Sequence, residues 1–445
     1  MGGPNKSGHD EKKVVDVVFD RRLDSSLAQP ICVAFSGGGD SLFALIAASA
    51  WAARCGRRVI ALHVDHRLQP ASGAWRAFAG EAAGRLGAGF QALAWTGEKP
   101  AIGLASAARR ARHALIAEAA RAAGATCVVL GHTADDIAES ALMRAEGSSL
   151  GTPAEWRPSP VWPQGRGVFV LRPLLSLRRA AIREALRAEG WTWIDDPANA
   201  DPRQPRARAR RALAGAAPSL AAAADEATPP FAGEADGWGA IRLDRQALRG
   251  AAGRRRLAAA MLSAGGGERP PRRERLEALF DRLAGPDDFT ATLAGARLVS
   301  GGDVRIARNA GEAARGGLAA VALEPGRPVV WDGRFELVAA RPGLVARALG
   351  GAMSRLAPED RRRLKAVPVE ARAGLPLVIG PPVVGADGGA SCPILAKLEG
   401  VHARSLVAQR FSAACGAILK EPRAQSDTRR IARVAKPGAA PYLER

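Results

Sequence analysis

The sequence predicts an α/β protein built on a doubly wound parallel sheet, with additional mixed α/β domains toward the C-terminus. Two observations support this prediction. Short apolar runs alternate with Ala- and Leu-rich stretches of helical length through the first half of the 445-residue chain. The first run, residues 31–35, passes through a glycine-rich turn directly into a helical stretch at 42–51. Such an alternation requires right-handed crossovers between parallel strands.

Four apolar runs bounded by turn residues are typical of buried strands, and the longer stretches that follow them are typical of helices. The expected strands are residues 31–35, 58–64, 90–95 and 126–130, of which 90–95 is the weakest. The expected helices are residues 42–51, 74–86, 105–123 and 137–144. Ligands of such sheets bind beyond the carboxyl ends of the strands, so functional residues are expected there.

The second half of the chain indicates two smaller domains. Helical stretches at 243–262 and 272–283 precede an expected β-hairpin at 289–307, which turns at two adjacent glycines. Short strand-like runs at 329–337 and 367–384 indicate a small, partly β domain. We therefore expect domains at 25–215, 240–310 and 325–425, a linker at 215–240 and a basic, loosely ordered tail at 429–445.

The charge balance predicts a polyanionic partner. The chain has 64 Lys and Arg against 44 Asp and Glu, a net charge of +20, which favours nucleic acid first and an acidic membrane second. A GC-rich genome is an alternative that explains the choice of Arg over Lys better than it explains the excess. Aromatic residues make up only 5%, which disfavours a broad base-stacking platform.

The location expected from the sequence is cytoplasmic. No apolar run approaches the roughly 18 residues of a membrane span, and the polar first residues lack a secretory signal. The five cysteines are scattered without a C-x-x-C pair, which disfavours a zinc ribbon, a cluster or a redox pair. Cys32 and Cys127 lie in apolar strands and are expected to be small core residues.

The turn at residues 36–41, SGGGDS, has the composition of an anion site. Glycines let backbone N–H groups converge on phosphate oxygens, and a helix N-terminus adds donors and a partial positive charge. A plain strand–helix turn is the alternative. Asp40 would repel a phosphate unless a cation lies between them, so the pairing predicts a magnesium nucleotide. The candidates are Ser36, Gly37, Gly38, Gly39, Asp40 and Ser41.

Two further polar clusters follow strands of the predicted sheet. One contains His63 and His66, and the other spans residues 131–140. Each has a structural alternative, because Thr133 and Asp136 fit a helix capping box and the histidines could be ordinary strand-end residues. Three polar clusters on one edge of one sheet favour a functional edge.

These residues also carry a resemblance. SGGGDS resembles the PP-loop of the N-type ATP pyrophosphatases, which cleave ATP between the α and β phosphates. Further segments are similar to the tRNA(Ile)-lysidine synthetases within that superfamily, in the right order over roughly residues 30–215. They are HVDHRLQ (63–69), AARRARH (107–113), GHTADDIAES (131–140), LRPLL (171–175) and WIDDPANADPRQPR (193–206).

The remaining half resembles the family only loosely, at TLAGARLV (292–299) and VRIAR (304–308). Four residues within the matched motifs depart from the family pattern. They are Arg67, His113, Ser140 and Ala207, where Gly, Tyr, Thr and Asn are usual.

The resemblance implies ATP and Mg²⁺ as cofactors, and free L-lysine and tRNA(Ile) with a CAU anticodon as substrates. The ε-amino group of lysine would displace AMP from an adenylated C2 of the wobble cytidine, changing codon reading from AUG to AUA. It implies catalytic roles for Asp40, which also holds Mg²⁺, and for Arg112, Asp136 and Arg206. It implies ATP binding by residues 36–41 and His63, and lysine or tRNA binding by His132, Asp135, Glu139, Arg208, Arg210 and Arg211.

Alternatives remain at the level of the sequence. Arg109 and Arg112 fit a solvated helix face, and residues 203–211 fit a basic linker as well as a tRNA-backbone contact. A PP-loop tRNA thiolase would need cysteines in active-site positions, and a non-catalytic RNA-binding protein would not need the intact SGG-x-DS. The oligomeric state stays open between monomer and homodimer. Because tRNA(Met) shares the CAU anticodon, residues 216–445 are expected to contribute to selection.

Overall fold

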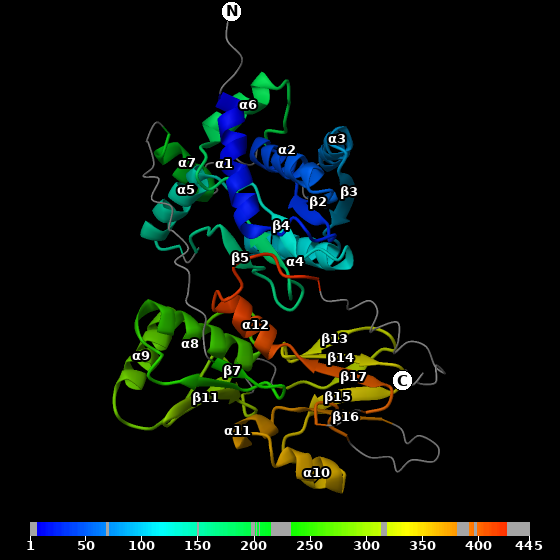
Figure 1. Cartoon of the computed structure of the whole chain (residues 1–445), viewed down its shortest axis with the longest axis vertical. Helices are drawn as coiled ribbons and strands as arrows, with labels where there is room; N and C mark the ends of the chain where they lie inside the picture. Colours follow the sequence, from blue (N-terminus) through cyan, green and yellow to red (C-terminus); the bar gives the residue numbers. More distant parts are fainter. Residues whose placement is uncertain are drawn as a thin grey trace, which may run out of the picture. The chain divides into compact units, whose positions relative to one another are not determined.

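The computed structural model describes residues 7–67, 71–148, 151–196, 201, 203, 205–214, 233–312, 318–380, 391–395 and 398–424. Contacts divide the chain into two units (Figure 1). The first comprises residues 1–227 together with 418–424, and the second comprises the rest. The expected tail at 429–445, and the linker as far as residue 232, lie outside the described residues. The division into three domains stays a prediction.

The first unit is built on a six-stranded sheet with the order β3-β2-β1-β4-β6-β5. All neighbouring strands are parallel except β5, which pairs antiparallel with β6. The predicted doubly wound parallel sheet is therefore confirmed, whereas β5 and β6 were not expected as strands. The strands are β1 Ile31–Ala34, β2 Val59–Asp65, β3 Gly89–Ala94, β4 Cys127–Val129, β5 Trp156–Pro158 and β6 Phe169–Leu171.

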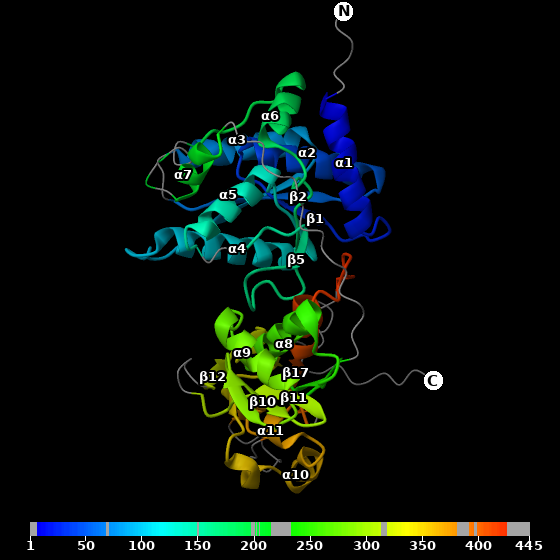
Figure 2. The same ribbon diagram turned by 90° about the vertical axis from the view of Figure 1, so that its left-hand side faces the viewer.

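Helices cover both faces of this sheet. Figure 2 shows α2 and α3 over one face and α4 beneath the other, as the right-handed crossover rule requires. The helices α1, α6 and α7 were not expected. Charged residues dominate α1 and α7, whereas α6 buries Ile182, Ala185 and Leu186 at a helical spacing that is visible in the sequence. The helices are α1 Ser7–Arg22, α2 Gly39–Arg54, α3 Ser72–Arg85, α4 Leu104–Ala122, α5 Ala134–Ala145, α6 Arg179–Ala188 and α7 Pro205–Ala212.

The core of the first unit fixes the strands that carry the PP-loop. Cys32 of β1, Leu62 of β2 and Val128 of β4 are buried together against Ile116 and Ala120 of α4. Burial of such side chains stabilises the fold by about 1.5–3 kcal/mol for each large one, so the ends of these strands are held rigidly. Cys32 and Cys127 are buried core residues, as the sequence predicts.

The second unit contains a five-stranded antiparallel sheet with the order β7-β8-β11-β10-β9, against which α8 packs. The expected hairpin is present, because β10 and β11 pair antiparallel with Ser300 opposite Val304. The elements are β7 Gly233–Ala235, β8 Ile241–Asp244, β9 Thr290–Leu293, β10 Ala296–Ser300, β11 Asp303–Arg308, α8 Gly250–Gly265, α9 Arg273–Ala284 and α12 Val407–Ala414.

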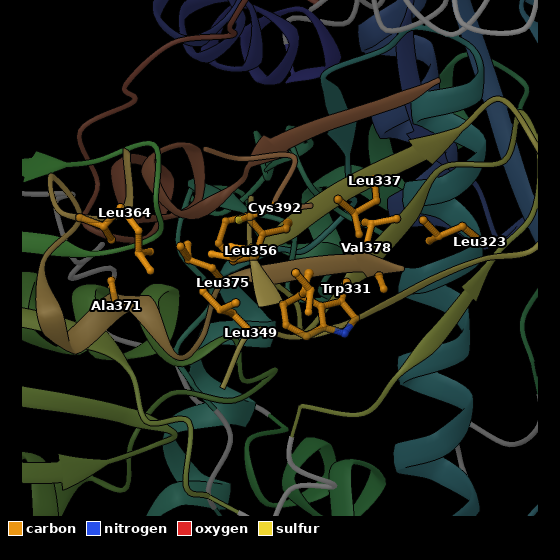
Figure 3. Close-up of a cluster of buried hydrophobic side chains, with 14 of the residues drawn as sticks. Leu323, Trp331, Leu337, Leu349, Leu356, Leu364, Ala371, Leu375, Val378 and Cys392 are labelled. Carbon is orange, nitrogen blue, oxygen red and sulfur yellow. The ribbon is translucent and has the colours of Figure 1, made fainter. Parts of the chain in front are cut away.

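Two three-stranded antiparallel sheets complete the second unit, with the orders β12-β15-β16 and β13-β14-β17. They share a cluster of buried side chains that includes Trp331, Leu337 and Val378 (Figure 3). Their elements are β12 Val321–Leu323, β13 Val329–Trp331, β14 Phe335–Ala339, β15 Leu344–Ala348, η2 Ala352–Arg355, α10 Pro358–Leu364, α11 Val369–Arg372, β16 Pro376–Ile379 and β17 Val401–Ser405.

Within the described part of the chain, none of the helices combines the length and the apolar character needed to span a bilayer.

Candidate active site

The PP-loop connects β1 to α2 and is held in one conformation by its own hydroxyl groups. The Ser41 Oγ donates to the Gly38 carbonyl at 2.8 Å and lies 3.1 Å from the Ser36 Oγ. Gly37 has a φ of +89°, and a Cβ there would collide with the Ile194 side chain. Position 37 therefore requires glycine on two grounds, backbone conformation and space.

A cavity of about 830 Å³ lies over this loop, at the carboxyl ends of β1, β2 and β4. The loop lines one side, polar residues from the other two predicted clusters line another, and residues of α3, α4, α6 and α7 complete the lining. The polar clusters that the sequence places at one edge of the sheet therefore line the same cavity. Of the candidate residues it brings together Ser36, Gly38, Gly39, Asp40, Ser41, His63, Arg112, His132, Asp136, Arg206 and Arg210.

Asp40 lies in the first turn of α2 and faces a cation from another helix. Its Oδ2 accepts a hydrogen bond from the Arg179 Nε at 2.9 Å. Its Oδ1 is buried and, among the described residues, has no hydrogen-bond partner. Burial raises the pKa of Asp40, and the charge of Arg179 opposes that increase. A buried carboxylate oxygen without a partner is an unusual feature that a bound cation would resolve.

Asp136 serves both of the purposes that the sequence left as alternatives. Its Oδ2 accepts from the backbone N–H of Thr133 at 2.7 Å and from the Thr133 hydroxyl at 3.0 Å, so it caps α5. Its Oδ1 points the other way, and the Arg206 Nη2 donates to it at 2.5 Å. Capping fixes one oxygen of the carboxylate, and the second oxygen is thereby aimed at the arginines of the site.

Glu139 lies one turn further along α5 and is almost fully buried, with 2% of its side chain exposed. It accepts hydrogen bonds from Arg206 at 2.8 Å, from Arg210 at 2.8 Å and from Arg179 at 3.1 Å. It does not line the cavity, so its role in this structure is to hold the arginines that do.

Asp135 also contacts arginines, but it does not itself line the cavity. Its carboxylate accepts from the Arg178 Nε at 3.2 Å and from the backbone N–H of Arg179 at 2.8 Å. Burial raises the pKa of Asp135, but these hydrogen bonds and charges outweigh burial and lower it overall. Lysine or tRNA binding by Asp135 and Glu139 stays a prediction.

Arg112 lines the cavity, and no described carboxylate lies beside its guanidinium within ion-pair distance. Burial, followed by the charges of Arg109 and Arg206, lowers the pKa of Arg112 to about 10. It is still charged at neutral pH, so the site presents an uncompensated positive charge suited to a phosphate.

Two histidines of the cavity are uncharged at neutral pH. The His63 Nδ1 lies 3.0 Å from the carbonyl oxygen of Phe35, and burial lowers its pKa. His132 receives a hydrogen bond from the Arg172 Nε at 3.2 Å, and its pKa is well below the usual range because of burial and the surrounding arginines. A neutral imidazole adds no positive charge to the arginine-rich site, and it becomes a cation only if it accepts a proton.

The basic segment at 203–211 is in part a helix, α7, rather than a linker throughout. Arg206 and Arg210 lie against the acids of α5, as described above. Arg208 and Arg211 are exposed, and the Arg208 Nη1 donates to the carbonyl oxygen of Arg203 at 3.2 Å. The helical period therefore separates the four candidate arginines into two that enter the site and two that face solvent.

The sequence alone did not single out Arg179, Arg183, Trp75 and Ile194, all of which line the cavity. The backbone N–H of Ile194 donates to the Gly37 carbonyl at 2.9 Å, so the segment after α6 lies directly on the PP-loop. The only sequence signal for Arg179 was its place shortly after the LRPLL segment.

The residues present fit a magnesium nucleotide. Mg²⁺ binds oxygen ligands and is usually held by one or two carboxylates together with substrate phosphates. Asp40 supplies such a carboxylate beside the glycines of the loop. Among the described residues no cluster of three or more His, Cys, Asp or Glu could hold a metal by itself.

Comparisons with known proteins agree with this geometry. A family model described as a PP-loop domain matches residues 11–217. The tRNA(Ile)-lysidine synthase of Caulobacter vibrioides is 51% identical over 413 residues, which cover 92% of this chain and 98% of that one. The tRNA(Ile)-lysidine synthase of Brucella anthropi is 34% identical, over 70% of this chain and 74% of its own.

Among solved structures, a U34-tRNA thiolase from Methanococcus maripaludis with a [4Fe-4S] cluster matches 46% of this chain and 73% of its own, with 15% identity and a TM-score of 0.38. The similarity to the Caulobacter enzyme is much greater and spans almost the full length of both chains. This chain belongs to the tRNA(Ile)-lysidine synthase family.

Proposed function

We propose that this protein is an ATP-dependent ligase that forms lysidine, by joining the ε-amino group of free L-lysine to C2 of the wobble cytidine in tRNA(Ile) with a CAU anticodon. The observation that carries the proposal is the single cavity that holds the PP-loop, Asp40, Arg112 and the Asp136–Arg206 pair. The names of the relatives support the same reaction.

The reaction needs activation first, because the C2 oxygen of cytidine is a poor leaving group. The glycines of the PP-loop and the N-terminus of α2 would bind the phosphates of ATP through backbone N–H groups. Asp40 would hold Mg²⁺, which when bound offsets phosphate charge. Arg112 lies where it could stabilise the charge that develops as pyrophosphate leaves and AMP is joined to the base.

The second step needs a site for an amine beside the adenylated base. Asp136 lines the cavity and Glu139 lies one turn behind it on α5, and Arg206 and Arg210 pair with them in this structure. Lysine carries both an ammonium and a carboxylate, so it could exchange with these pairs, its ammonium toward the acids and its carboxylate toward the arginines. His132 lines the same cavity, but its Nδ1 already accepts a hydrogen bond from Arg172 and its pKa is well below the usual range, so it is poorly suited to accept the proton that the amine must lose.

A PP-loop thiolase is the other enzymatic interpretation, and the cysteines disfavour it. Burial raises the pKa of Cys32 to about 12 and that of Cys127 well above its usual range. The thiolate is the reactive form of cysteine, so neither can act as a sulfur carrier at neutral pH. Among the described residues, those that line the cavity include no cysteine.

The test is mass spectrometry of tRNA(Ile) with a CAU anticodon after incubation with the protein, ATP, Mg²⁺ and lysine. We expect the mass of the wobble nucleoside to increase by that of lysine less one water, and one pyrophosphate to be released per modified tRNA. Modification that requires a sulfur donor in place of lysine would support the thiolase. Binding of tRNA without ATP cleavage would indicate a protein that binds tRNA but catalyses no reaction on it. With a tRNA as its substrate, the protein is expected to act in the cytoplasm.

A further inference from the structure

Arg179 connects three elements of the catalytic unit that are far apart in the sequence. It is the first residue of α6, and its Nε donates to the Asp40 Oδ2 of the PP-loop helix at 2.9 Å. Its Nη1 donates to the Glu139 Oε1 at 3.1 Å, and its Nη2 lies 3.4 Å from the Asp136 Oδ1. One guanidinium thus contacts three carboxylates from two helices.

The backbone of Arg179 is fixed as well as its side chain. Its N–H donates to the Asp135 Oδ2 at 2.8 Å, so α6 begins at a fixed position relative to α5. The side chain is only 19% exposed, which limits its freedom to turn toward solvent. A planar guanidinium that bonds several carboxylates sets their orientation as well as their charge.

The Asp40 carboxylate depends on Arg179 more than the other acids of the site do. Among the described residues, Arg179 is the only ion-pair partner of the Asp40 carboxylate, whereas Asp136 and Glu139 also pair with the arginines of α7. Without Arg179 the Asp40 carboxylate could rotate. It would also face the carboxylate of Asp136 with no cation between the two.

We propose that Arg179 is a positioning residue, which fixes the Asp40 carboxylate against the acids of α5 so that the phosphate- and metal-binding end of the cavity keeps one geometry. This inference rests on the proposed function. Arg179 acts through Asp40 and takes no part in the bond changes.

The Mg²⁺ dependence of ATP binding separates this role from a purely structural one. The charged groups that face Asp40 are Arg179 and Arg183 from α6 and Asp136 from α5. Among the described residues the buried Asp40 Oδ1 has no hydrogen-bond partner, and the bond from Arg179 to Oδ2 fixes the direction in which Oδ1 points. Without Arg179 the carboxylate can rotate, so we expect Mg²⁺ to strengthen ATP binding less.

The variants are Arg179→Gln and Arg179→Lys. The first removes both the positive charge and the planar set of guanidinium donors, and the second keeps the charge but loses the planar donors. Arg178→Gln is the matched control, because Arg178 is the adjacent residue and pairs with Asp135, which does not line the cavity. Pyrophosphate release with tRNA(Ile) and lysine is measured for each variant at saturating ATP and Mg²⁺. Thermal unfolding verifies the fold of each variant.

For Arg179→Gln we expect kcat to fall at least about tenfold, because the Asp40 carboxylate is no longer held in place. For Arg179→Lys we also expect a loss in kcat, because the ammonium keeps the charge but not the directed hydrogen bonds of the guanidinium. Arg178→Gln should stay within about twofold of the unaltered protein. Binding of ATP, measured by calorimetry with Mg²⁺ and with EDTA, should show a smaller gain from Mg²⁺ in Arg179→Gln only.

The outcomes are distinct. A folded Arg179→Gln variant with the kcat and the Mg²⁺ gain of the control would overturn the positioning role. If Arg179→Gln does not fold, Arg179→Lys decides, and full activity in that variant overturns the role equally. Absence of lysine-dependent pyrophosphate release from the unaltered protein would instead refute the proposed function on which the inference rests.

Discussion

Arg57 and Glu421 lie 364 positions apart and form a buried bidentate ion pair, with N–O distances of 2.7 and 2.8 Å. Their side chains are 1% and 0% exposed. Arg57 precedes β2, and Gln29 and Thr126, which precede β1 and β4, also contact the Glu421 carboxylate. The returning segment at 418–424 therefore completes the catalytic unit at the edge of the sheet opposite the active site.

The first prediction concerns the stability of that unit. Glu421→Ala leaves the Arg57 guanidinium buried without a charged partner, which should cost about 3–5 kcal/mol in the free energy of unfolding. Urea denaturation measures it. The control is Glu359→Ala, which breaks an exposed pair with Arg363 and should cost less than about 1 kcal/mol. Equal effects of the two substitutions would show that the returning segment is not needed for stability.

The second prediction concerns truncation. A chain that ends near Pro218 lacks the segment at 418–424, so we expect it to be unstable for a reason unrelated to tRNA. A variant that joins residue 214 to residue 416 through a flexible linker should fold and bind ATP. It should lose most tRNA binding and the preference for isoleucine tRNA over methionine tRNA, measured by lysine incorporation. Undiminished preference in this variant would mean that the second unit is not the selector.

The third prediction concerns Asp40. Asp40→Ala and Asp40→Asn should abolish pyrophosphate release. Because burial raises the pKa of Asp40 in the folded state, its ionisation at neutral pH opposes folding, and the neutral Asn should leave stability unchanged or increase it. Pyrophosphate assays and thermal unfolding of the same preparations decide both points. Near-normal turnover in either variant would contradict the PP-loop assignment.

The fourth prediction separates two arginines of α7 that are adjacent in the sequence. Arg210→Glu places a second acid beside Glu139 and should reduce the rate of lysine incorporation severely. Arg211→Glu alters an exposed residue and should mainly weaken tRNA binding, reducing the log–log salt slope by roughly 0.7–0.9 for each phosphate that is no longer neutralised. Titrations at several salt concentrations, beside turnover assays, distinguish them. If Arg211→Glu leaves the slope unchanged, its side chain does not bind a phosphate.

The fifth prediction concerns pH. Burial, followed by the charges of Arg112 and Arg109, lowers the pKa of His113 to about 2, against 6.5 in the unfolded chain. Below a pH of about 6.5 the unfolded chain therefore binds a proton that the folded protein does not, and stability falls as pH falls, by about 1.4 kcal/mol per pH unit from this residue. His113→Phe should remove that contribution in urea denaturation between about pH 6.5 and 5. An unchanged pH dependence would show that His113 has the same pKa in the folded and unfolded states.

The PP-loop and the sheet were predictable because their signals are local. Glycines at 37–39, an apolar strand before them and a helix after them define the loop within about 20 residues. The capping box at Thr133 and Asp136 was visible for the same reason. The sequence left open whether Asp136 caps a helix or serves the site, and the structure shows that its two oxygens divide the tasks.

The tertiary structure alone decided which charges meet. Arg179 and Asp40 are 139 positions apart, and nothing in the residues near either one distinguishes this arginine from the many others in the chain. The same holds for Arg57 and Glu421. Periodicity and glycine placement determine secondary structure because they act within one or two turns. The partner of a long charged side chain depends on how whole elements pack, and that is fixed only when the sheet and its helices are assembled.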